Sequence, residues 1–528
     1  MSDETVAPAT GGQALLAGLA DNGVDICFSN PGTSELDLVA ALEREDRIRA
    51  VPVAFEGVAS GAADGYGRMT GRPAATLLHL APGLHNASAN LHNALKAGTP
   101  IINLVGDHAR SHRDYTTALS ADLEAIAATQ SAWVERVDTA DTAYASAQRA
   151  FGQSLRRRGP ASLLVASEAC WSTPGANNTD ETGPEETDAR ELGNIGAAAA
   201  ALGRADKPAL LVGGLALTDP GLDACARLAA NGVRVLSEQF PARQTRGAGR
   251  FQPETLQYFT EAAQEQLAGT DLMLILGTAP PAGTFAYVDR PARPLPEGCS
   301  ELVLDADPRF VAESLSALAD AIGAPTVARQ PAPAIAPPAC PPGAITLQTL
   351  AACLRRQMPE QAIICDDGVT ASGFAFGACA DGPEHDWLKL TGGALGLGTP
   401  MSIGTALAAP ARKTICLTGD GAALYTLSSL WTLAREQLDV TVLVVANRSY
   451  DILKVELSRM PHIQPPPGMM QALSLDPPAV DYVAIANGFA IEAVRCESCE
   501  ALDGALAEAI ASPGPRLVEA VCESVIPG

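Results

Sequence analysis

Residues 413–447, KTICLTGDGAALYTLSSLWTLAREQLDVTVLVVAN, indicate the fold class of this chain. The apolar run TICL predicts a strand that ends at Gly419-Asp420-Gly421, a helix is expected just after it, and a second apolar strand ends at Asn447. Such a βαβ unit belongs to a parallel sheet, which binds ligands at its strand ends. Asp420 and Asn447 could hold one divalent cation, and the glycines leave backbone N–H groups free for a diphosphate. An ordinary tight turn after a core strand is the competing interpretation.

The length and composition of the chain indicate a protein of several domains. Its 528 residues exceed what one hydrophobic core can organise and suggest three domains of ordinary size. The chain is 47% hydrophobic but only 4% aromatic, a balance that suits helices packed closely on parallel sheets. We therefore expect the α/β class.

The charge balance excludes some partners. With 36 basic and 60 acidic residues, the net charge is −24, and the sequence contains no basic block that could follow a nucleic-acid backbone. No apolar run approaches membrane-span length without charged or turn residues. The start MSDETVAPATGG is acidic and lacks the apolar core of a signal peptide. We expect a cytoplasmic protein that binds neither nucleic acid nor membranes.

The order of patterns along the chain predicts three doubly wound parallel-sheet domains. Helical and strand patterns alternate across a first domain, residues 1–170, and a linker without hydrophobic period follows at residues 171–192. Apolar runs separated by helical segments predict a central domain at residues 193–323. A proline-rich linker, residues 324–343, precedes the third domain, residues 344–528, which contains the opening βαβ unit.

Two further signals are weak. Gly213-Gly214 follows the apolar run PALLV, but the rest of a GxGxxG pattern is missing, so a structural turn is favoured over a dinucleotide site. The twelve cysteines are scattered through apolar surroundings and read as small core residues. Cys496 and Cys499 form a CxxC, yet no second pair or His lies at zinc-ligand spacing. A metal or redox role is therefore disfavoured.

Several motifs together carry a family resemblance. Between Gly421 and Asn447 lie 25 residues, as in the thiamine diphosphate (ThDP) fingerprint of GDG followed by Asn. With NPGTSEL (30–36), FEGVASGAADGYGRMTGRPA (55–74) and LLHLAPGLHNASANLHNA (77–94), the sequence resembles the ThDP-dependent decarboxylase and acetolactate synthase superfamily over essentially the whole chain. It is most similar to benzoylformate decarboxylase and to acetolactate synthase large subunit-like proteins.

The resemblance implies two cofactors, ThDP and Mg²⁺, and an arrangement of domains. The first domain would bind the pyrimidine and the third the diphosphate, with the two halves of a site contributed by different subunits. A homodimer or homotetramer with shared active sites follows from it. The implied metal ligands are Asp420, Asn447 and the backbone oxygen of Ser449. The other implied cofactor contacts in the third domain are Gly393, Leu395, Gly419, Gly421, Ala422 and Tyr450, with Leu395 as the bulky residue beneath the cofactor.

Glu56 matches the family's catalytic glutamate. It follows the strand-like run VPVAF and precedes a helix rich in glycine and alanine. The resemblance implies that its carboxylate faces N1′ of the pyrimidine and favours the imino tautomer that creates the C2 ylide. A glutamate at a helix start could instead simply favour the helix dipole. Asn86, in the next motif, is expected to contact the cofactor.

The resemblance also suggests residues of the substrate pocket. His79 matches an active-site histidine, with a satisfied strand-end histidine as the alternative, and Thr33 replaces a serine that contacts the substrate carboxylate. Phe285 stands where benzoylformate decarboxylase has a second catalytic histidine. A phenyl ring cannot relay protons, so a long-lived enamine and carboligation become plausible. Ile452 and Leu453 are expected to line the acceptor side of the pocket, together with Tyr450.

The implied activity is decarboxylation or carboligation of a 2-keto acid through ylide and enamine intermediates, with an aldehyde or second keto acid as acceptor. After Asn447 the chain lacks the Gln-Trp-Gln element of true acetolactate synthases, which puts their substrate pair and their flavin in doubt. The alternatives are cleavage or ligation of the 2-hydroxyacyl-CoA lyase type and a catalytically silent ThDP-binding homologue. A dinucleotide-dependent oxidoreductase is disfavoured because no GxGxxG opens a βαβ unit.

Overall fold

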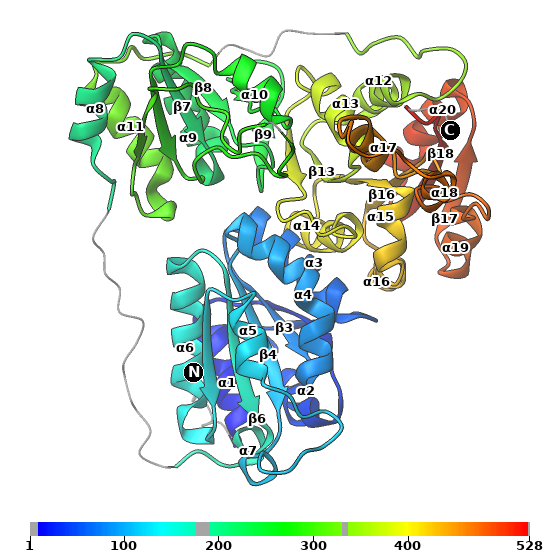
Figure 1. The fold of residues 1–528 in the computed structure, drawn as a ribbon. Coiled ribbons are helices and arrows are strands. Elements are labelled where there is room, and N and C mark those ends of the chain that lie inside the picture. Colours follow the sequence, from blue (N-terminus) through cyan, green and yellow to red (C-terminus); the bar gives the residue numbers. More distant parts are fainter. Residues whose placement is uncertain (1–8, 176–190, 289, 330–335, 526–528) are drawn as a thin grey trace.

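The computed structural model describes residues 9–175, 191–288, 290–329 and 336–525. The elements gather around three sheets, one in each third of the chain (Figure 1). The predicted α/β class with three parallel-dominated sheets is confirmed. Most of the predicted linker at 171–192, and the middle of the one at 324–343, lie outside the described residues.

The N-terminal sheet has six parallel strands in the order β2-β1-β3-β4-β6-β5. Its strands are β1 (Ile26–Asn30), β2 (Arg49–Pro52), β3 (Ala74–Leu78), β4 (Ile101–Asp107), β5 (Trp133–Val137) and β6 (Pro160–Ala166). Its helices are α1 (Gly11–Asp21), η1 (Thr33–Glu35), α2 (Leu36–Leu42), α3 (Glu56–Thr70), α4 (Leu80–Ala97), η2 (Arg110–His112), α5 (Leu123–Ala128), α6 (Ala140–Arg156) and α7 (Ser167–Trp171). Helices cover both faces of this sheet, as a doubly wound fold requires.

The central sheet has five parallel strands in the order β10-β8-β7-β11-β12. Its strands are β7 (Pro208–Val212), β8 (Arg234–Ser237), β10 (Glu254–Thr255), β11 (Leu272–Leu276) and β12 (Ser300–Val303). The helices around it are α8 (Ile195–Leu202), η3 (Gly214–Leu217), α9 (Asp219–Ala230), α10 (Thr260–Gln266), η4 (Pro308–Phe310) and α11 (Val311–Ala321). The strand order reverses beside β7, so a ligand site is expected at the end of that strand.

The C-terminal sheet has seven strands in the order β17-β18-β16-β15-β13-β14-β9. Its strands are β9 (Gln244–Arg246), β13 (Ala362–Asp367), β14 (His385–Lys389), β15 (Thr414–Gly419), β16 (Val440–Ala446), β17 (Glu492–Cys496) and β18 (Arg516–Val521). Its helices are α12 (Leu347–Gln357), α13 (Thr370–Ala378), α14 (Gly398–Ala408), α15 (Asp420–Ala423), η5 (Leu424–Thr426), α16 (Ser429–Arg435), α17 (Asp451–Ser458), α18 (Pro467–Ala472), α19 (Tyr482–Gly488) and α20 (Cys499–Ala511).

Two details of the C-terminal sheet differ from the sequence expectation. Strand β9 comes from the predicted central domain yet pairs antiparallel with β14, so the chain crosses between the two sheets. The single helix expected after Gly421 is three short pieces, α15, η5 and α16. The Thr426 hydroxyl donates to the Gly396 carbonyl at 2.9 Å, which ties this interrupted segment to a neighbouring glycine-rich loop.

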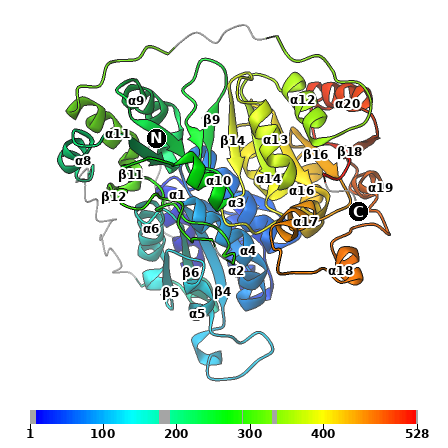
Figure 2. The same ribbon diagram turned by 45° about the horizontal axis from the view of Figure 1, so that its top comes forward.

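Helices α3 and α14 join the N-terminal and C-terminal sheets. Small residues let the backbones approach, because a Cβ at Gly65 would lie 2.1 Å from the Met401 carbonyl oxygen. A Cβ at Gly404 would lie 1.9 Å from the Ala62 carbonyl oxygen, so neither glycine accepts a side chain without displacement. One buried hydrophobic cluster runs through this contact from the first sheet into the last. Figure 2 shows α3 and α14 between the two sheets.

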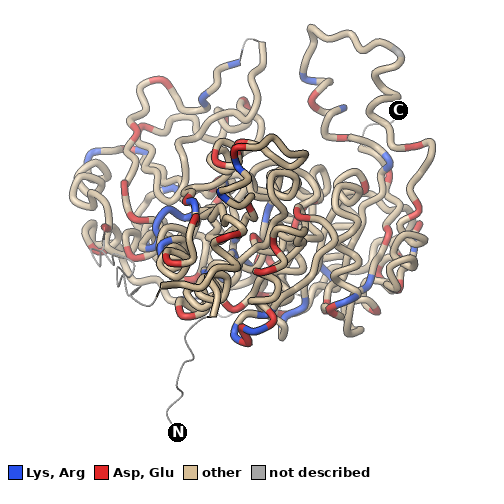
Figure 3. The backbone as a smooth tube through the Cα atoms, turned by 90° about the horizontal axis from the view of Figure 1, so that it is seen from below, with Lys and Arg blue, Asp and Glu red and all other residues tan. Residues whose placement is uncertain are grey.

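Acidic and basic residues are interspersed along the backbone (Figure 3). Within the described part of the chain, no helix is both long enough and apolar enough to cross a bilayer.

The described cysteines all carry free thiols; only Cys299 and Cys340 are half-buried and the rest are buried, as the sequence predicted.

Candidate functional site

The C-terminal sheet brings the three predicted metal ligands together. Strands β15 and β16 are neighbours, so Asp420 and Asn447 follow adjacent strand ends. The Asp420 carboxylate accepts from the N–H of Arg448 at 2.6 Å and from the N–H of Gly421 at 2.8 Å. The Asn447 amide oxygen accepts from the Ser449 N–H at 3.2 Å. The chain after β16 therefore curls around the Asp420 carboxylate.

The donors at this place suit a hard divalent cation. Carboxylate, amide and carbonyl oxygens are the ligands that Mg²⁺ prefers. Asp420 is only 5% exposed, and this burial raises the pKa of its carboxyl to about 6. The buried hydroxyl oxygen of Ser449 has no hydrogen-bond partner in the described chain. A bound cation would offset the cost of burying the Asp420 charge, so the residues fit the metal that the sequence implied.

The turn after β15 is shaped by its glycine. A Cβ at Gly421 would lie 2.9 Å from Cε1 of Tyr450, so only glycine lets the tyrosine ring pack against this turn. Ala422 is buried directly after it, whereas nothing lies within 4 Å of a Cβ built on Gly419. The predicted cofactor contacts Gly419, Gly421, Ala422 and Tyr450 therefore lie around one turn beside the metal ligands.

A glycine-rich loop precedes α14 and carries Leu395, which is half-buried. Asp367, the last residue of β13, accepts through Oδ2 from the N–H groups of Gly396 at 2.8 Å and Gly398 at 3.2 Å. Its other oxygen is buried without a hydrogen-bond partner among the described residues, and burial raises the pKa of this carboxyl to about 7. The sequence patterns did not assign Asp367 to the site.

The N-terminal half of the chain holds the other side of this loop. The side-chain oxygen of Asn93, on α4, accepts from the N–H groups of Gly392 at 3.1 Å and Ala394 at 3.2 Å. The Asn93 amide donates back to the Ala394 carbonyl at 2.8 Å. Gly393 lies between them with a φ of +73°, a conformation that favours glycine. Asn93 belongs to the motif after His79, but no pattern within that motif singled it out.

Glu56 is the first residue of α3, and its predicted neighbour Asn86 lies on α4. The Asn86 amide donates to Oε2 of Glu56 at 2.9 Å. Glu56 is 6% exposed, and a Cβ at Gly83 would lie 3.0 Å from its Oε1. The carboxylate is thus held in one orientation in a close-fitting place, which goes beyond what a helix-dipole role needs.

His79 directly follows β3 and forms a pair that the sequence did not predict. Its Nδ1 lies 2.8 Å from Oε2 of Glu35, a carboxylate that is fully buried and also accepts from the Gly32 N–H. A carboxylate at Nδ1 fixes the ring orientation and leaves Nε2 as the reactive nitrogen. A Cβ at Gly32 would lie 2.1 Å from the ring, so the glycine of NPGTSEL makes room for His79. Thr33, the predicted carboxylate contact, is exposed on the same turn.

The remaining pocket residues lie around α17. Phe285 is 55% exposed on the loop after β11, and Leu453 is 47% exposed on α17, with Ile452 half-buried beside it. The Tyr287 hydroxyl donates to the Glu456 carboxylate of α17 and joins this loop to that helix. The loop that carries Phe285 therefore contacts the helix that carries Ile452 and Leu453.

The predicted residues of the site are divided between two sheets. Glu56 and His79 belong to the N-terminal sheet, and Asp420 and Asn447 to the C-terminal sheet. In the described part of the chain, no hydrogen bond or ion pair links Glu56 with Asp420 or Asn447.

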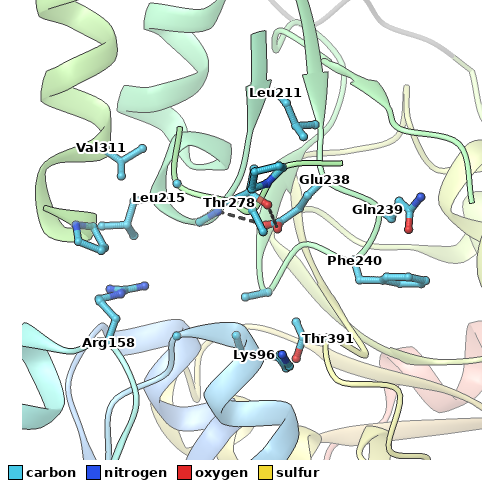
Figure 4. A pocket seen from close by; sticks show the side chains of 18 of the residues that line it. Lys96, Arg158, Leu211, Leu215, Glu238, Gln239, Phe240, Thr278, Val311 and Thr391 are labelled. Carbon is cyan, nitrogen blue, oxygen red and sulfur yellow. Dashed lines mark hydrogen bonds between the residues drawn. The ribbon is translucent and has the colours of Figure 1, made fainter. Parts of the chain in front are cut away.

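A separate cavity of about 410 Å³ opens at the ends of the central strands. Figure 4 shows Arg158 and Lys96, from the N-terminal domain, facing Glu238 and Thr278 of the central sheet. Glu238 follows β8 and accepts from the Gly214 N–H at 3.2 Å and from the Thr278 hydroxyl at 2.8 Å. Burial raises the pKa of the Glu238 carboxyl to about 7. An acid after the second strand is where doubly wound sheets bind a ribose, so this cavity has nucleotide-site features that the glycine pair alone did not predict.

Comparison with known protein families gives two matches. Residues 9–131 match the family described as thiamine pyrophosphate enzyme, N-terminal TPP binding domain. Residues 377–520 match the thiamine pyrophosphate enzyme, C-terminal TPP binding domain. Each half of the site described above falls within one of these matches, apart from Asp367, Phe285 and the N-terminal part of the third sheet.

Similar proteins span nearly the whole chain. A Mycobacterium tuberculosis protein, provisionally named acetolactate synthase large subunit IlvX, is 43% identical over 98% of this chain and 99% of its own. The benzoylformate decarboxylase of Pseudomonas aeruginosa is 27% identical over 96% of this chain and 98% of its own. The solved structure of a ThDP-dependent 4-hydroxybenzoylformate decarboxylase from Rhodococcus jostii superposes with a TM-score of 0.84 at 23% identity and covers 98% of this chain and 99% of its own. This last likeness concerns the fold.

Proposed function

Because the chain belongs to the thiamine pyrophosphate enzyme family, we propose that it is a Mg²⁺- and ThDP-dependent enzyme that decarboxylates or ligates 2-keto acids. The proposal extends to the division of the chain into a pyrimidine-binding domain (1–170), a central domain (193–323) and a diphosphate-binding domain (344–528). Its substrates are a 2-keto acid donor and, for ligation, an aldehyde or keto-acid acceptor.

Each predicted residue has a task that its geometry allows. Asp420, Asn447 and the Ser449 carbonyl would hold Mg²⁺, and the turn at Gly421 would bind the diphosphate. When bound, ThDP supplies a carbon nucleophile and an electron sink for loss of carbon dioxide. Glu56 would hold a proton at the pyrimidine nitrogen, and His79, oriented by Glu35, would move a proton to or from the substrate. Leu395, on the loop that Asp367 and Asn93 hold, would fix the bend of the cofactor.

The observation that carries the proposal is the buried carboxylate of Glu56, oriented by Asn86. A protein that merely binds the cofactor needs the metal and diphosphate contacts, but has no use for a carboxylate held in this way. The metal and diphosphate contacts alone would not separate an enzyme from a silent homologue, whereas the oriented Glu56 carboxylate supports an enzyme.

The test is a substrate screen with a matched variant. The protein loaded with ThDP and Mg²⁺ is offered pyruvate, benzoylformate and longer 2-keto acids, and carbon dioxide and acyloins are measured. We expect Glu56→Gln to lower kcat by about 10²- to 10⁴-fold, the usual contribution of a proton-transfer group to the rate. Glu135→Gln neutralises a glutamate on β5 that pairs with Arg149 of α6, and this variant should retain activity. No turnover of any substrate by the wild type, or equal turnover by Glu56→Gln, would contradict the proposal.

We further propose that the active unit is a homodimer or a homotetramer. The family resemblance assigns the N-terminal and C-terminal halves of each site to different subunits, so a second copy would complete the site. Mixing Glu56→Gln protein with Asp420→Asn protein tests this arrangement. If the sites are shared, each mixed dimer holds one intact site, which would restore about a quarter of the wild-type activity on random mixing and at most about a half. If each site lies within one chain, no activity would return.

One observation favours the runner-up, reaction of a 2-hydroxyacyl-CoA thioester. The central cavity places Arg158 and Lys96 opposite Glu238, which suits the phosphates and ribose of an adenine nucleotide. Titration calorimetry tests whether the cavity binds ADP or coenzyme A, and turnover assays with acyl-CoA and 2-keto acid substrates separate the two activities. Binding of coenzyme A that Arg158→Ala weakens, together with acyl-CoA turnover, would favour the runner-up over the 2-keto acid reaction.

A further inference from the structure

Three metal-ligating side chains meet at the end of the proline-rich linker, far from the predicted Mg²⁺ ligands in sequence. One ligand atom each from Cys340, Cys353 and Asp503 lies within 4.8 Å of the other two. Cys340 is half-buried on the linker, Cys353 is fully buried on α12, and Asp503 lies on α20. Three separate segments of the chain therefore converge on one point.

Backbone contacts fix how the two thiols face each other. Both sulfur atoms point at the carbonyl oxygen of Cys499, Cys340 from 3.7 Å and Cys353 from 3.8 Å. The Cys499 N–H in turn donates to the Gly343 carbonyl at 2.8 Å, which anchors the end of the linker at the start of α20. The two thiols are thus held side by side by the folded backbone, without a covalent bond between them.

The carboxylate is held in place as metal-ligating carboxylates commonly are. The Gln357 amide donates to one oxygen of Asp503 at 2.7 Å, and Nε of Arg356 donates to the other at 3.2 Å. Arg356 also donates to the Pro338 carbonyl at 3.0 Å. The same arginine therefore orients the carboxylate and holds the linker, which leaves remaining lone pairs of Asp503 available to a cation.

We propose that Cys340, Cys353 and Asp503 bind a thiophilic divalent cation of the zinc class, which fastens the linker to α12 and α20. Two sulfur ligands select zinc-like cations over Mg²⁺, which prefers oxygen. Tetrahedral zinc with bonds of about 2.3 Å would separate its two sulfur ligands by roughly 3.8 Å, which the limit of 4.8 Å allows. Solvent can complete the coordination because Cys340 is only half-buried. Binding replaces the two thiol protons with the metal and releases them to solvent.

The site is independent of the proposed catalytic function, since none of its ligands lies on a strand end of the candidate active site.

Cobalt(II) provides the test, because thiolate ligands give it charge-transfer absorption in the near ultraviolet. Reduced full-length protein is first loaded with ThDP and Mg²⁺ to occupy oxygen sites and is then titrated with cobalt chloride. We expect one equivalent to produce the thiolate band, and one equivalent of zinc chloride to abolish it. Cys340→Ser and Cys353→Ser should lose the band, and Asp503→Asn should weaken cobalt affinity by more than about 10-fold.

Cys299→Ser is the matched control, because Cys299 is the other half-buried cysteine and lies in the central domain. It should bind cobalt as the wild type does. Cys340→Ser, on the linker, keeps the buried core intact and so tests the site even if Cys353→Ser fails to fold. The absence of a thiolate band in the wild type, or the same band in Cys340→Ser, would overturn the proposal.

Discussion

The N-terminal and C-terminal sheets share one topology but end their strands in different chemistry. Numbered within each domain, the strands of both follow the order 2-1-3-4-6-5, with β9 added to the edge of the second sheet. The third strand of the first sheet, β3, is followed by His79, and that of the other, β15, by Asp420. Under the proposed function, equivalent places would carry a proton-transfer group in one domain and a metal ligand in the other.

The partners of the buried carboxylates explain the difference. In the N-terminal sheet, Glu56 meets the amide of Asn86, and Glu35 meets the ring of His79. In the C-terminal sheet, Asp420 and Asp367 meet backbone N–H groups. Under the proposed function, the side-chain partners would orient groups that exchange protons, whereas the backbone partners would shape a cation-binding turn and a loop. The same fold would then serve two purposes according to what surrounds each acid.

The largest effect is expected at Asp420. Asp420→Asn keeps the shape of the side chain but removes the charge that would bind Mg²⁺, so ThDP affinity in the presence of Mg²⁺ should fall by more than about 100-fold. Titration calorimetry of ThDP with and without Mg²⁺ measures this. Asp381→Asn, at an exposed acid that pairs with Arg355 in the same domain, is the control and should bind normally. An unchanged affinity in Asp420→Asn would remove the metal role from this strand end.

A smaller effect is expected at the equivalent N-terminal position. His79→Ala should lower kcat by about 10²-fold while leaving the affinity for Mg²⁺ and ThDP near that of the wild type, because no metal ligand is touched. Glu35→Gln should cause a smaller loss, since it removes only the group that orients the ring. In the double variant the two losses should not add, because Glu35 acts through His79. Additive losses would show that Glu35 has a separate role.

Much of this comparison could be predicted from the sequence because strand ends are local signals. The GDG turn, the Asn after the next strand and the FEG start of a helix each mark a strand end within a few residues. The partners Glu35, Asn93 and Asp367 could not be assigned, because their contacts join segments 44, 299 and 29 residues apart. The crossing of β9 into the last sheet escaped prediction for the same reason, since it depends on tertiary packing rather than on a local pattern.

Asp367 offers a test of the contrast between carboxylates held by side chains and carboxylates held by backbone N–H groups. Burial raises the pKa of this carboxyl to about 7, from an ordinary value of 3.8. Between pH 4 and pH 7 the native state therefore holds a proton that the unfolded chain has lost, so rising pH lowers stability by on the order of 4 kcal/mol. Asp367→Asn resembles the protonated acid and removes this slope. Its unfolding midpoint should rise relative to the wild type from pH 5 to pH 8.

Parallel midpoints across that range would show that Asp367 is ionised throughout. Asp367→Ala serves as the comparison, because it removes the acceptor of the Gly396 and Gly398 N–H groups and should weaken ThDP binding at every pH. Asp367→Asn keeps an acceptor oxygen and should affect binding much less. A loss of binding that is equal in the two variants would mean that the charge, and not the hydrogen bonds, shapes the loop of Leu395.

The smallest change in rate, although a visible change in product, is expected at Phe285. Its loop contacts α17, the helix of Ile452 and Leu453, through the Tyr287–Glu456 hydrogen bond, and we expect a side chain at this position to face that region. Phe285→His adds a group that can deliver a proton there, which should raise the ratio of aldehyde to acyloin by a few-fold with little change in substrate consumption. Phe285→Leu controls for the loss of the aromatic ring and should leave the ratio near that of the wild type. Equal ratios in Phe285→His and Phe285→Leu would show that this loop does not deliver the proton, and the choice between decarboxylation and ligation would then rest with His79.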